Sequence, residues 1–263
     1  MSGNDQVWQK SAVVQRYLEG VRGGIPLAAA QFDILLRLVR AARPHVTRFL
    51  DLGCGDGVLG LALLEEHPQA EGLFLDFSEP MIEAARQRVK AISGDRHRFV
   101  LEDYGRPEWL SRVRADGPFD VVVSGYSIHH QTDERKRQLY EELLGLLEPG
   151  GLFLNLEHVA SRSEWGAALF DEYFIDSLWA HHERSGVGQS RQEIADAYVH
   201  RADKEANILA TVEAQCDWLR ELGYERVDCY FKTFELALFG GCRPADTNRF
   251  EHRTSNVQRR TSK

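Results

Sequence analysis

The 263-residue sequence predicts an α/β protein built on a doubly wound, mostly parallel sheet. Strand and helix patterns alternate regularly between residues 46 and 160, which is typical of that architecture. The expected strand at 119–124 is nearly continuous in apolar residues, as a parallel strand covered on both faces should be. A turn with glycines at positions 53, 55 and 57 joins the first strand to a helix, which is typical of a nucleotide-type pocket.

Two helices are expected before the first strand. The first is centred on Tyr17 and the second spans residues 27–42, because apolar residues recur there at helical spacing. Pro44 marks the end of the second helix. We expect residues 1–45 to cover the cofactor site.

The core elements follow at 46–160. In chain order we expect a strand at 47–52, a helix at 58–66, a strand at 72–77, a helix from Ser78 to about Ile92, a strand at 98–103, a short helix near Trp109, a strand at 119–124, a helix at 132–147 and a strand at 152–157. The sequence Pro149-Gly150-Gly151 predicts a turn before that last strand.

The alternation of strands and helices stops after residue 160. Residues 161–210 show helical patterns and polar turns without a strand, so we interpret them as a helical cap inserted over the site. Residues 211–242 contain a helix at 212–222 and two strands, 226–231 and 234–239, which are expected to pair as a hairpin before Gly240-Gly241. Residues 243–263 form a loose basic tail.

Composition narrows the classes of partner. The formal net charge is -8, so nucleic acid is not the expected partner, because phosphate binding needs a concentrated positive face. No run of about 18 apolar residues is present, so neither a membrane span nor a membrane partner is expected. The four cysteines lack paired spacing, which favours reduced thiols in a cytoplasmic protein.

Two aspartates narrow the ligand of the glycine turn. Asp76 ends the second strand, where a carboxylate can accept both ribose hydroxyls of an adenosine ligand. Asp51 lies inside the first strand, where its charge would repel a pyrophosphate but suits a cationic ligand or an ammonium group. Together they favour S-adenosylmethionine over NAD as the cofactor.

Four segments resemble the motifs of the class I S-adenosylmethionine-dependent methyltransferases, and within that family the small-molecule enzymes. The segments are 50–57, 75–81, 119–124 and 147–151, in the order of the family's motifs. The resemblance covers residues 49–157. It implies a Rossmann-like, seven-stranded sheet whose last strand, at 234–239, is reversed.

The same resemblance implies the methionine and ribose contacts of the cofactor. Gly53 and Gly55 would lie against the methionine part, with Asp51 near its amino end. Asp76 would hold the ribose hydroxyls.

The adenine and sulfonium contacts are implied in the same way. Phe77 and Met81 would flank the adenine, and Asp103 with Tyr104 beside it would lie near the exocyclic amine. Ser124 would close the fourth strand beneath the reactive sulfonium.

The loop after the fourth strand supplies the candidate catalytic residues. His129 and His130 are candidates for a general base, because imidazole titrates near neutral pH. Neighbouring residues on a loop rarely point the same way, so a structural histidine is the competing interpretation. Tyr126 is a candidate for orienting the acceptor, and Glu157-His158 opens onto the same face.

Aromatic residues recur at helical spacing in the expected cap. They are Trp165, Phe170, Tyr173, Phe174 and Trp179. A packed face and an aromatic acceptor pocket both explain them, since a helix over a site does both. A metal site is not expected, because adjacent histidines do not chelate one ion easily and no HxxxH or HxxE spacing occurs.

These observations predict a methyltransferase that uses S-adenosylmethionine on a small-molecule acceptor held under the cap. Two alternatives stay open: a methyltransferase acting on RNA or protein, and a protein that modifies the cofactor or binds it without catalysis. The sequence leaves open whether the acceptor atom is N, O, S or C. It also leaves open a homodimer beside a monomer.

Overall fold

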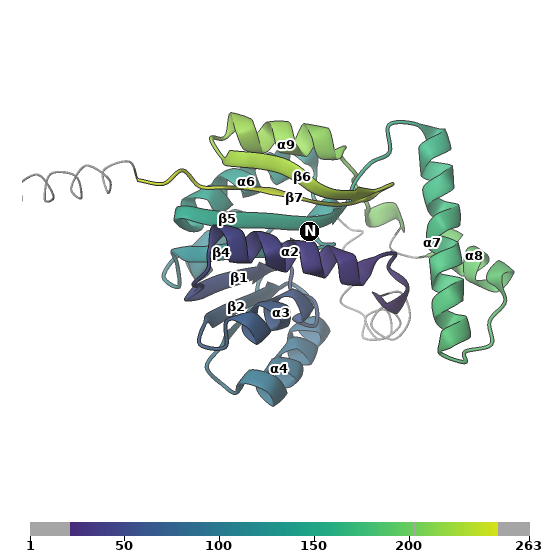
Figure 1. Cartoon of the computed structure of the whole chain (residues 1–263), viewed down its shortest axis with the longest axis horizontal. Helices are drawn as coiled ribbons and strands as arrows, with labels where there is room; N and C mark the ends of the chain where they lie inside the picture. The colour runs from purple at the N-terminus through teal and green to yellow at the C-terminus, as the bar shows by residue number, and fades with distance from the viewer. Residues whose placement is uncertain (1–21, 202–203, 247–263) are drawn as a thin grey trace, which may run out of the picture.

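The computed structural model describes residues 22–201 and 204–246. A seven-stranded sheet with the order β3-β2-β1-β4-β5-β7-β6 forms its centre (Figure 1). The strands are β1 (Arg48–Leu52), β2 (Glu71–Asp76), β3 (Arg98–Leu101), β4 (Phe119–Gly125), β5 (Leu147–His158), β6 (Glu225–Thr233) and β7 (Leu236–Cys242). Strand β7 runs antiparallel to β5 and β6, and the other neighbours are parallel. The predicted fold class, with its reversed last strand, is confirmed.

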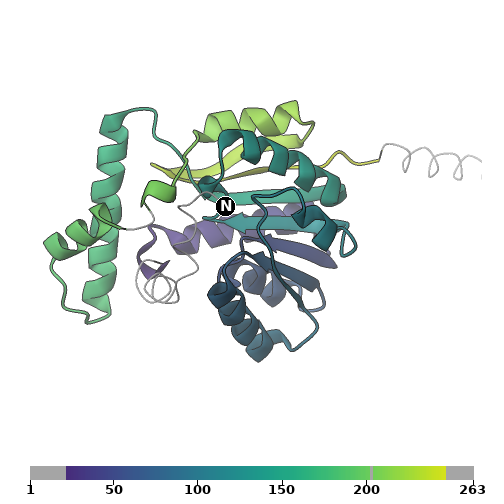
Figure 2. The ribbon, with the colours of Figure 1, turned by 180° about the vertical axis from the view of Figure 1, so that it is seen from behind.

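Helices cover both faces of the sheet (Figures 1 and 2). One face packs against α2 (Ala28–Ala42), α3 (Val58–Glu66) and α4 (Glu79–Ser93). The other packs against α5 (Trp109–Val113), α6 (Asp133–Leu146) and α9 (Val212–Glu221). The expected helix around Tyr17 lies outside the described residues.

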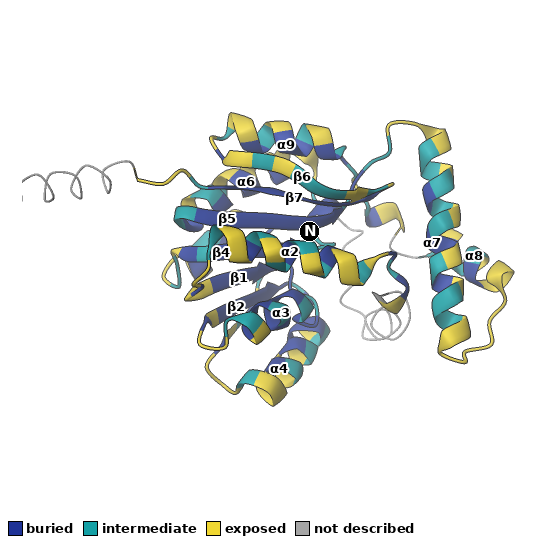
Figure 3. Cartoon of the chain, viewed as in Figure 1, coloured by how far each residue is buried: buried dark blue, intermediate teal, exposed yellow. Residues whose placement is uncertain are grey.

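The central strands are buried on both sides (Figure 3). Along β4, Val121 and Val123 pack toward α2 and α3, whereas Val122 between them packs toward α6. All three are fully buried. Alternate side chains of a strand point to opposite faces, so a strand between two helical layers needs apolar residues throughout.

The predicted start of β5 was wrong. The strand begins at Leu147 and includes Pro149-Gly150-Gly151, where the sequence predicted a turn. A register shift opposite Phe119 and Val121 accommodates the extra residues as a bulge. The N–H of Gly150 donates to the carbonyl of Arg243 (3.0 Å), which ties the bulge to the chain that leaves β7.

The second correction concerns the end of β7, which extends through Gly240 and Gly241 to Cys242. A Cβ at Gly240 would overlap the carbonyl oxygen of Phe153 in β5, so glycine permits the close approach of these two strands. Phe234, expected to open the strand, lies in the turn before it with φ 48°.

The insert after β5 contains α7 (Glu164–Arg184), α8 (Arg191–Val199) and the 3-10 helix η5 (Lys204–Ala206). Ser163 caps the first turn of α7, and Ser190 forms a capping box with Glu193 at the start of α8. Both helices stand to one side of the sheet (Figure 1). No helix in the described part of the chain is long and apolar enough to cross a membrane.

Candidate functional site

The turn between β1 and α3 has the backbone that its glycines allow. Gly53, Gly55 and Gly57 all have positive φ, at 66°, 54° and 80°. A side chain is strained in that region, whereas glycine enters it freely. A Cβ at Gly55 would meet only Met81 Sδ, 3.9 Å away, so the turn keeps open space on that side.

Asp76 lies next to this turn, at the end of β2. One carboxylate oxygen accepts the N–H of Gly55 (2.9 Å), and the other accepts the N–H of Ser78 (2.9 Å). Burial raises the pKa of Asp76 to about 6, although these hydrogen bonds oppose the shift. A carboxylate has about four lone-pair sites, so Asp76 can still accept from a hydroxyl group of a bound diol.

Asp51 is more deeply enclosed than Asp76. Its carboxylate accepts the N–H of Gly60 in the first turn of α3 (2.8 Å), and only 1% of the residue is exposed. Burial raises the pKa of Asp51 well above its usual range. Asp51 therefore anchors the helix that follows the glycine turn.

Tyr104 and Ser127 form a wall of the same region. Their hydroxyl groups are 2.6 Å apart, and a Cβ at Gly53 would overlap the side chain of Ser127. The carboxylate of Asp103 accepts the N–H of Gly105 (2.8 Å). The loop after β4 thus touches both the glycine turn and the loop after β3.

The other predicted cofactor residues surround this turn. Phe77 directly follows Asp76, and Met81 is buried on α4. Ser124 is fully buried and donates to the carbonyl of Leu52 (2.8 Å), which joins the carboxyl ends of β4 and β1. Three left-handed glycines, a buried acid at the end of β2 and an open face at Gly55 fit an adenosine cofactor with an amino acid moiety.

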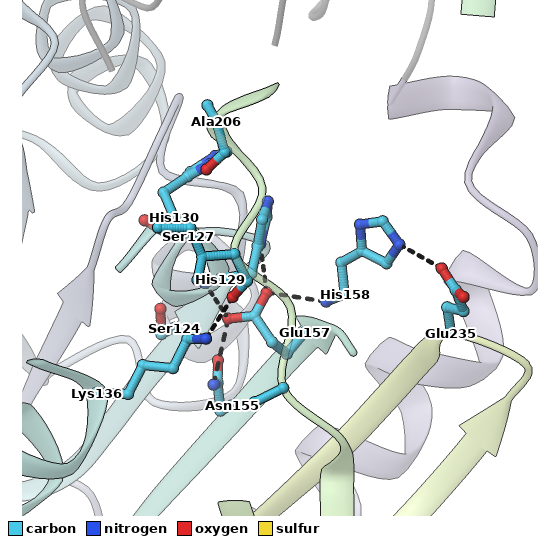
Figure 4. Close-up of polar contacts among 12 residues, drawn as sticks. Ser124, Ser127, His129, His130, Lys136, Asn155, Glu157, His158, Ala206 and Glu235 are labelled. Carbon is cyan, nitrogen blue, oxygen red and sulfur yellow. Dashed lines mark hydrogen bonds and ion pairs between the residues drawn. The ribbon is translucent and has the colours of Figure 1, made fainter. Parts of the chain in front are cut away.

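His129 and Glu157 form a buried pair at the ends of η4 (Ile128–His130) and β5 (Figure 4). His129 Nδ1 lies 2.6 Å from Glu157 Oε1, and the His129 backbone N–H donates to Oε2 (3.0 Å). Burial lowers the pKa of His129 well below its usual value and raises the pKa of Glu157 to about 7. A neutral imidazole therefore faces a carboxyl group that titrates near neutral pH.

His130 has a different partner. Its Nδ1 lies 3.2 Å from the carbonyl oxygen of Ala206, in the segment that returns from the insert. A carbonyl oxygen only accepts, so Nδ1 carries the proton and Nε2 of the neutral ring is an acceptor. The two rings are 4.0 Å apart between centroids.

The returning segment is also held from α6. Lys136 is fully buried and donates to Asp133 (2.8 Å) and to the carbonyl of Ile208. The N–H of Ile208 donates to the carbonyl of His129 (2.9 Å). Residues 206–208 are therefore fixed against the loop that holds both histidines.

His158 is the third histidine of this region, and its ring centroid lies 5.7 Å from that of His129. Its Nε2 lies 2.9 Å from Glu235, in the turn just before β7 (Figure 4). Burial opposes ionisation of Glu235, but hydrogen bonds from His158 and Ser161 outweigh it and hold the pKa below its usual value. Across the described residues, no three His, Cys, Asp or Glu side chains are grouped to hold a metal ion.

Tyr126 lies between the main sheet and the insert. Its hydroxyl donates to Gln31 on α2 (2.8 Å), and its ring packs against the apolar clusters of both parts. The insert forms a second buried cluster together with Leu236 of β7. Its members are Phe170, Phe174, Ile175, Leu178, Ile194, Tyr198 and Leu236.

The expected aromatic stripe of the insert divides in the structure. Phe170 and Phe174 are buried, whereas 75% of Trp165 and 38% of Trp179 are exposed. Tyr173 contacts Phe234 of the final hairpin, with ring centroids 5.5 Å apart. Part of the stripe is a packed face.

Sequence patterns missed the partners of the candidate residues. Gln31 and Lys136 are polar residues on amphipathic helices, where exposure is the usual expectation. Ser127 carries no motif, and neither does Asn155, whose amide donates to Glu157 Oε2 (3.4 Å). Glu157 lies beside His158 in the sequence, but its contact with His129 is a long-range one that spacing does not reveal.

The known proteins that this chain resembles are methyltransferases. Residues 49–151 match the family model described as a methyltransferase domain. The ribosomal RNA large subunit methyltransferase G of Shewanella amazonensis is 33% identical over 132 residues, 48% of this chain and 33% of that protein. The trans-aconitate 2-methyltransferase of an Acidovorax species is 28% identical over 197 residues, 75% of this chain and 64% of that protein. The chain thus spans one third to two thirds of these relatives.

A solved structure agrees with the fold. Human N-acetylserotonin methyltransferase, solved with S-adenosylmethionine, superimposes with a TM-score of 0.58 at 13% identity. The likeness covers 93% of this chain and 60% of that one. At this identity it shows the shared fold.

Proposed function

Because the chain belongs to the class I S-adenosylmethionine-dependent methyltransferases, we propose that it methylates a small-molecule acceptor held under the α7–α8 insert. The observation that supports this best is the position of three histidines, His129, His130 and His158. They lie at the carboxyl ends of β4 and β5, between the glycine turn and the insert. Ligands bind at that edge of an open α/β sheet.

The cofactor would lie across the ends of β1, β2 and β4. Gly55 leaves room for its methionine part beside Gly53, and Asp76 would accept the ribose hydroxyls. Asp51 supports the turn from below, near the amino end. We place five further side chains around the adenine and the sulfonium. They are Phe77, Met81, Tyr104, Ser124 and Asp103.

The bound cofactor supplies a methyl group that its sulfonium already activates. The protein therefore has to position the acceptor, exclude water and, for an acceptor that must lose a proton, accept that proton. Phe174 and Tyr198 stack in the insert with ring centroids 5.4 Å apart, and Phe170 packs on His158. These rings would form the apolar wall of the acceptor site.

We assign proton acceptance to His130. Its Nδ1 proton is donated to Ala206, so Nε2 is the basic nitrogen. His129 would support it from the buried side, because Glu157 fixes both its ring and its backbone. Tyr126 would orient the acceptor through its ring, since its hydroxyl proton goes to Gln31.

Label transfer tests the proposal. The protein is incubated with methyl-labelled S-adenosylmethionine and a cell extract divided into small-molecule, RNA and protein fractions. We expect label in the small-molecule fraction, with much less at limiting cofactor when Asp76→Ala replaces the wild type. Label in RNA or protein would contradict the small-molecule acceptor, and label left on intact or altered cofactor would contradict methyl transfer.

A second candidate is methylation of RNA. The ribosomal RNA relative favours it, since that protein is 33% identical over 132 residues. Residues 242–263 carry six Lys or Arg against two Asp or Glu, the most basic part of the sequence. A chain ending at residue 246 that still labels a small acceptor at the wild-type rate would exclude this candidate.

A further inference from the structure

Gln31 is a fully buried polar residue in α2, with 0% of its surface exposed. Its Nε2 donates to the carbonyl of Pro26 (2.8 Å), and its Oε1 accepts the hydroxyl proton of Tyr126 (2.8 Å). An amide without partners is costly in an apolar interior, so both bonds matter to the fold around it. The residue joins two segments that are 100 positions apart, from Pro26 to Tyr126.

Tyr126 is held in a strained position. Its φ of 51° lies in the left-handed region, which tyrosine rarely adopts, and its N–H donates to the carbonyl of Leu156 (2.7 Å). Among the partly buried hydrophobic residues that the structure describes, it alone packs against both the α2–α3 side of the sheet core and the buried cluster of the insert. It precedes His129 and His130 by three and four residues.

The other end of Gln31 leads to the insert. Pro26 follows Ile25, which packs against the insert cluster. Before it, Gly23 and Gly24 lie so close to α7 that a Cβ on either would overlap His181 or Leu178. The 22–26 segment and Tyr126 therefore approach the insert from two sides, and Gln31 connects them.

We propose that Gln31 is a positioning residue for the acceptor side of the site. By fixing Tyr126 and Pro26 at once, it sets the placement of the loop 125–130 against α7 without touching the residues assigned to the cofactor. The predicted effect on the reaction rate rests on the proposed function. A displacement of about 1 Å in such a loop lowers the rate of methyl transfer about 100-fold.

The experiment compares three substitutions with the wild type. Gln31→Met removes both hydrogen bonds at similar size, and Tyr126→Phe removes one of them. Gln31→Glu is a pH-dependent rescue, because a protonated carboxyl group donates once and accepts once, as the amide does. Gln87→Met, on an exposed face of α4, is the control.

The first readout is amide hydrogen exchange in 23–27, 125–130 and 164–184. We expect Gln31→Met to speed exchange about tenfold in all three segments, since a lost buried hydrogen bond changes a local equilibrium by that order. The double variant with Tyr126→Phe should exchange no faster. Gln31→Glu should match the wild type at about pH 6, where burial keeps the carboxyl protonated, and resemble Gln31→Met at about pH 8.

The second readout separates positioning from loss of fold. S-adenosylhomocysteine affinity and the KM for S-adenosylmethionine should stay within about twofold in Gln31→Met, while the rate at saturating cofactor falls about tenfold or more. Unchanged exchange in 125–130 and 164–184, or an equal loss of cofactor affinity, would overturn the proposal. Failure of the wild type to bind S-adenosylhomocysteine would instead reject the proposed function. The exchange measurement would still test whether Gln31 fixes the loop 125–130 against α7.

Discussion

Glu157 holds His129 at two points, through the ring Nδ1 (2.6 Å) and through the backbone N–H (3.0 Å). Its Oε1 also accepts the N–H of His158 (2.8 Å), so one fully buried carboxyl group organises the ends of η4 and β5. Removing a buried acceptor that serves several donors leaves those donors without a partner, so a change at Glu157 should affect the stability of this part of the fold.

The first prediction concerns stability and pH. Burial raises the pKa of Glu157 from 4.5 to about 7, so the folded protein binds this proton more tightly than the unfolded chain. The stabilisation is complete below pH 4.5 and is lost as pH rises to about 7. Thermal unfolding of the cofactor-free protein should therefore show a fall in stability over that range.

Glu157→Gln isolates this contribution. The variant should be less stable by about 1–3 kcal/mol, because an amide cannot accept at both oxygen positions, and its stability should fall less steeply with pH. Parallel curves for the two proteins between pH 4.5 and 7 would rule out Glu157 as the titrating group.

The second prediction concerns cofactor binding. Asp76→Ala should weaken S-adenosylhomocysteine binding about 10- to 100-fold by calorimetry, because two hydroxyl groups lose their acceptor. Asp95→Ala, on the exposed surface, should bind as the wild type does. An unchanged affinity in Asp76→Ala would move the cofactor away from the end of β2.

Affinity should also follow the charge of Asp76. Its pKa of about 6 means that the wild type loses affinity as pH falls through that value, because the protonated acid has one acceptor fewer. In Asp76→Asn this pH dependence should be absent.

A third prediction uses the glycine turn. Gly53→Ala places a methyl group at a φ of 66° and against Ser127, so it should lower stability by about 1–3 kcal/mol and weaken cofactor binding. Gly94→Ala is the matched control, because φ there is 78° and no atom lies within 4 Å. It should cost only the backbone strain, about 1 kcal/mol.

Adding Ser127→Gly to Gly53→Ala should recover part of the loss, since the overlapping side chain is gone. If the single Gly53→Ala variant melts no lower than Gly94→Ala, the contact with Ser127 has no energetic weight.

The fourth prediction separates the two neighbouring histidines. His130→Gln should leave the melting temperature nearly unchanged and lower the rate of methyl transfer to a proton-bearing acceptor about 100-fold or more. His129→Gln should lower stability by about 1–3 kcal/mol, because it breaks the pairing with Glu157. The reverse pattern in melting and rate measurements would exchange their roles.

The fold was largely readable from the sequence, because its signals are local. The apolar strand 119–124 and the helix 58–66 follow from the order of neighbouring residues, and the glycine turn follows from its spacing. The bulge at Pro149-Gly150-Gly151 and the glycines inside β7 depend on adjacent strands, so a local pattern indicated a turn where the structure has a strand.

The site was readable only in part for the same reason. His129 and His130 were found by residue type and by their place after β4. Their different hydrogen-bond partners, Glu157 and Ala206, are 28 and 76 positions away. No sequence pattern indicates that Gln31 is buried, because a glutamine in a helix is normally expected to be exposed.

The direction of β7 has a practical consequence for handling the protein. Cys242 pairs with Leu152, whereas Leu236 pairs with His158, so the chain leaves the sheet at the edge opposite the histidines (Figure 1). A dye or a surface linker attached near Asp246 would leave the insert and the glycine turn open to solution. The same attachment at Phe234, which contacts Tyr173 of α7, would obstruct the insert.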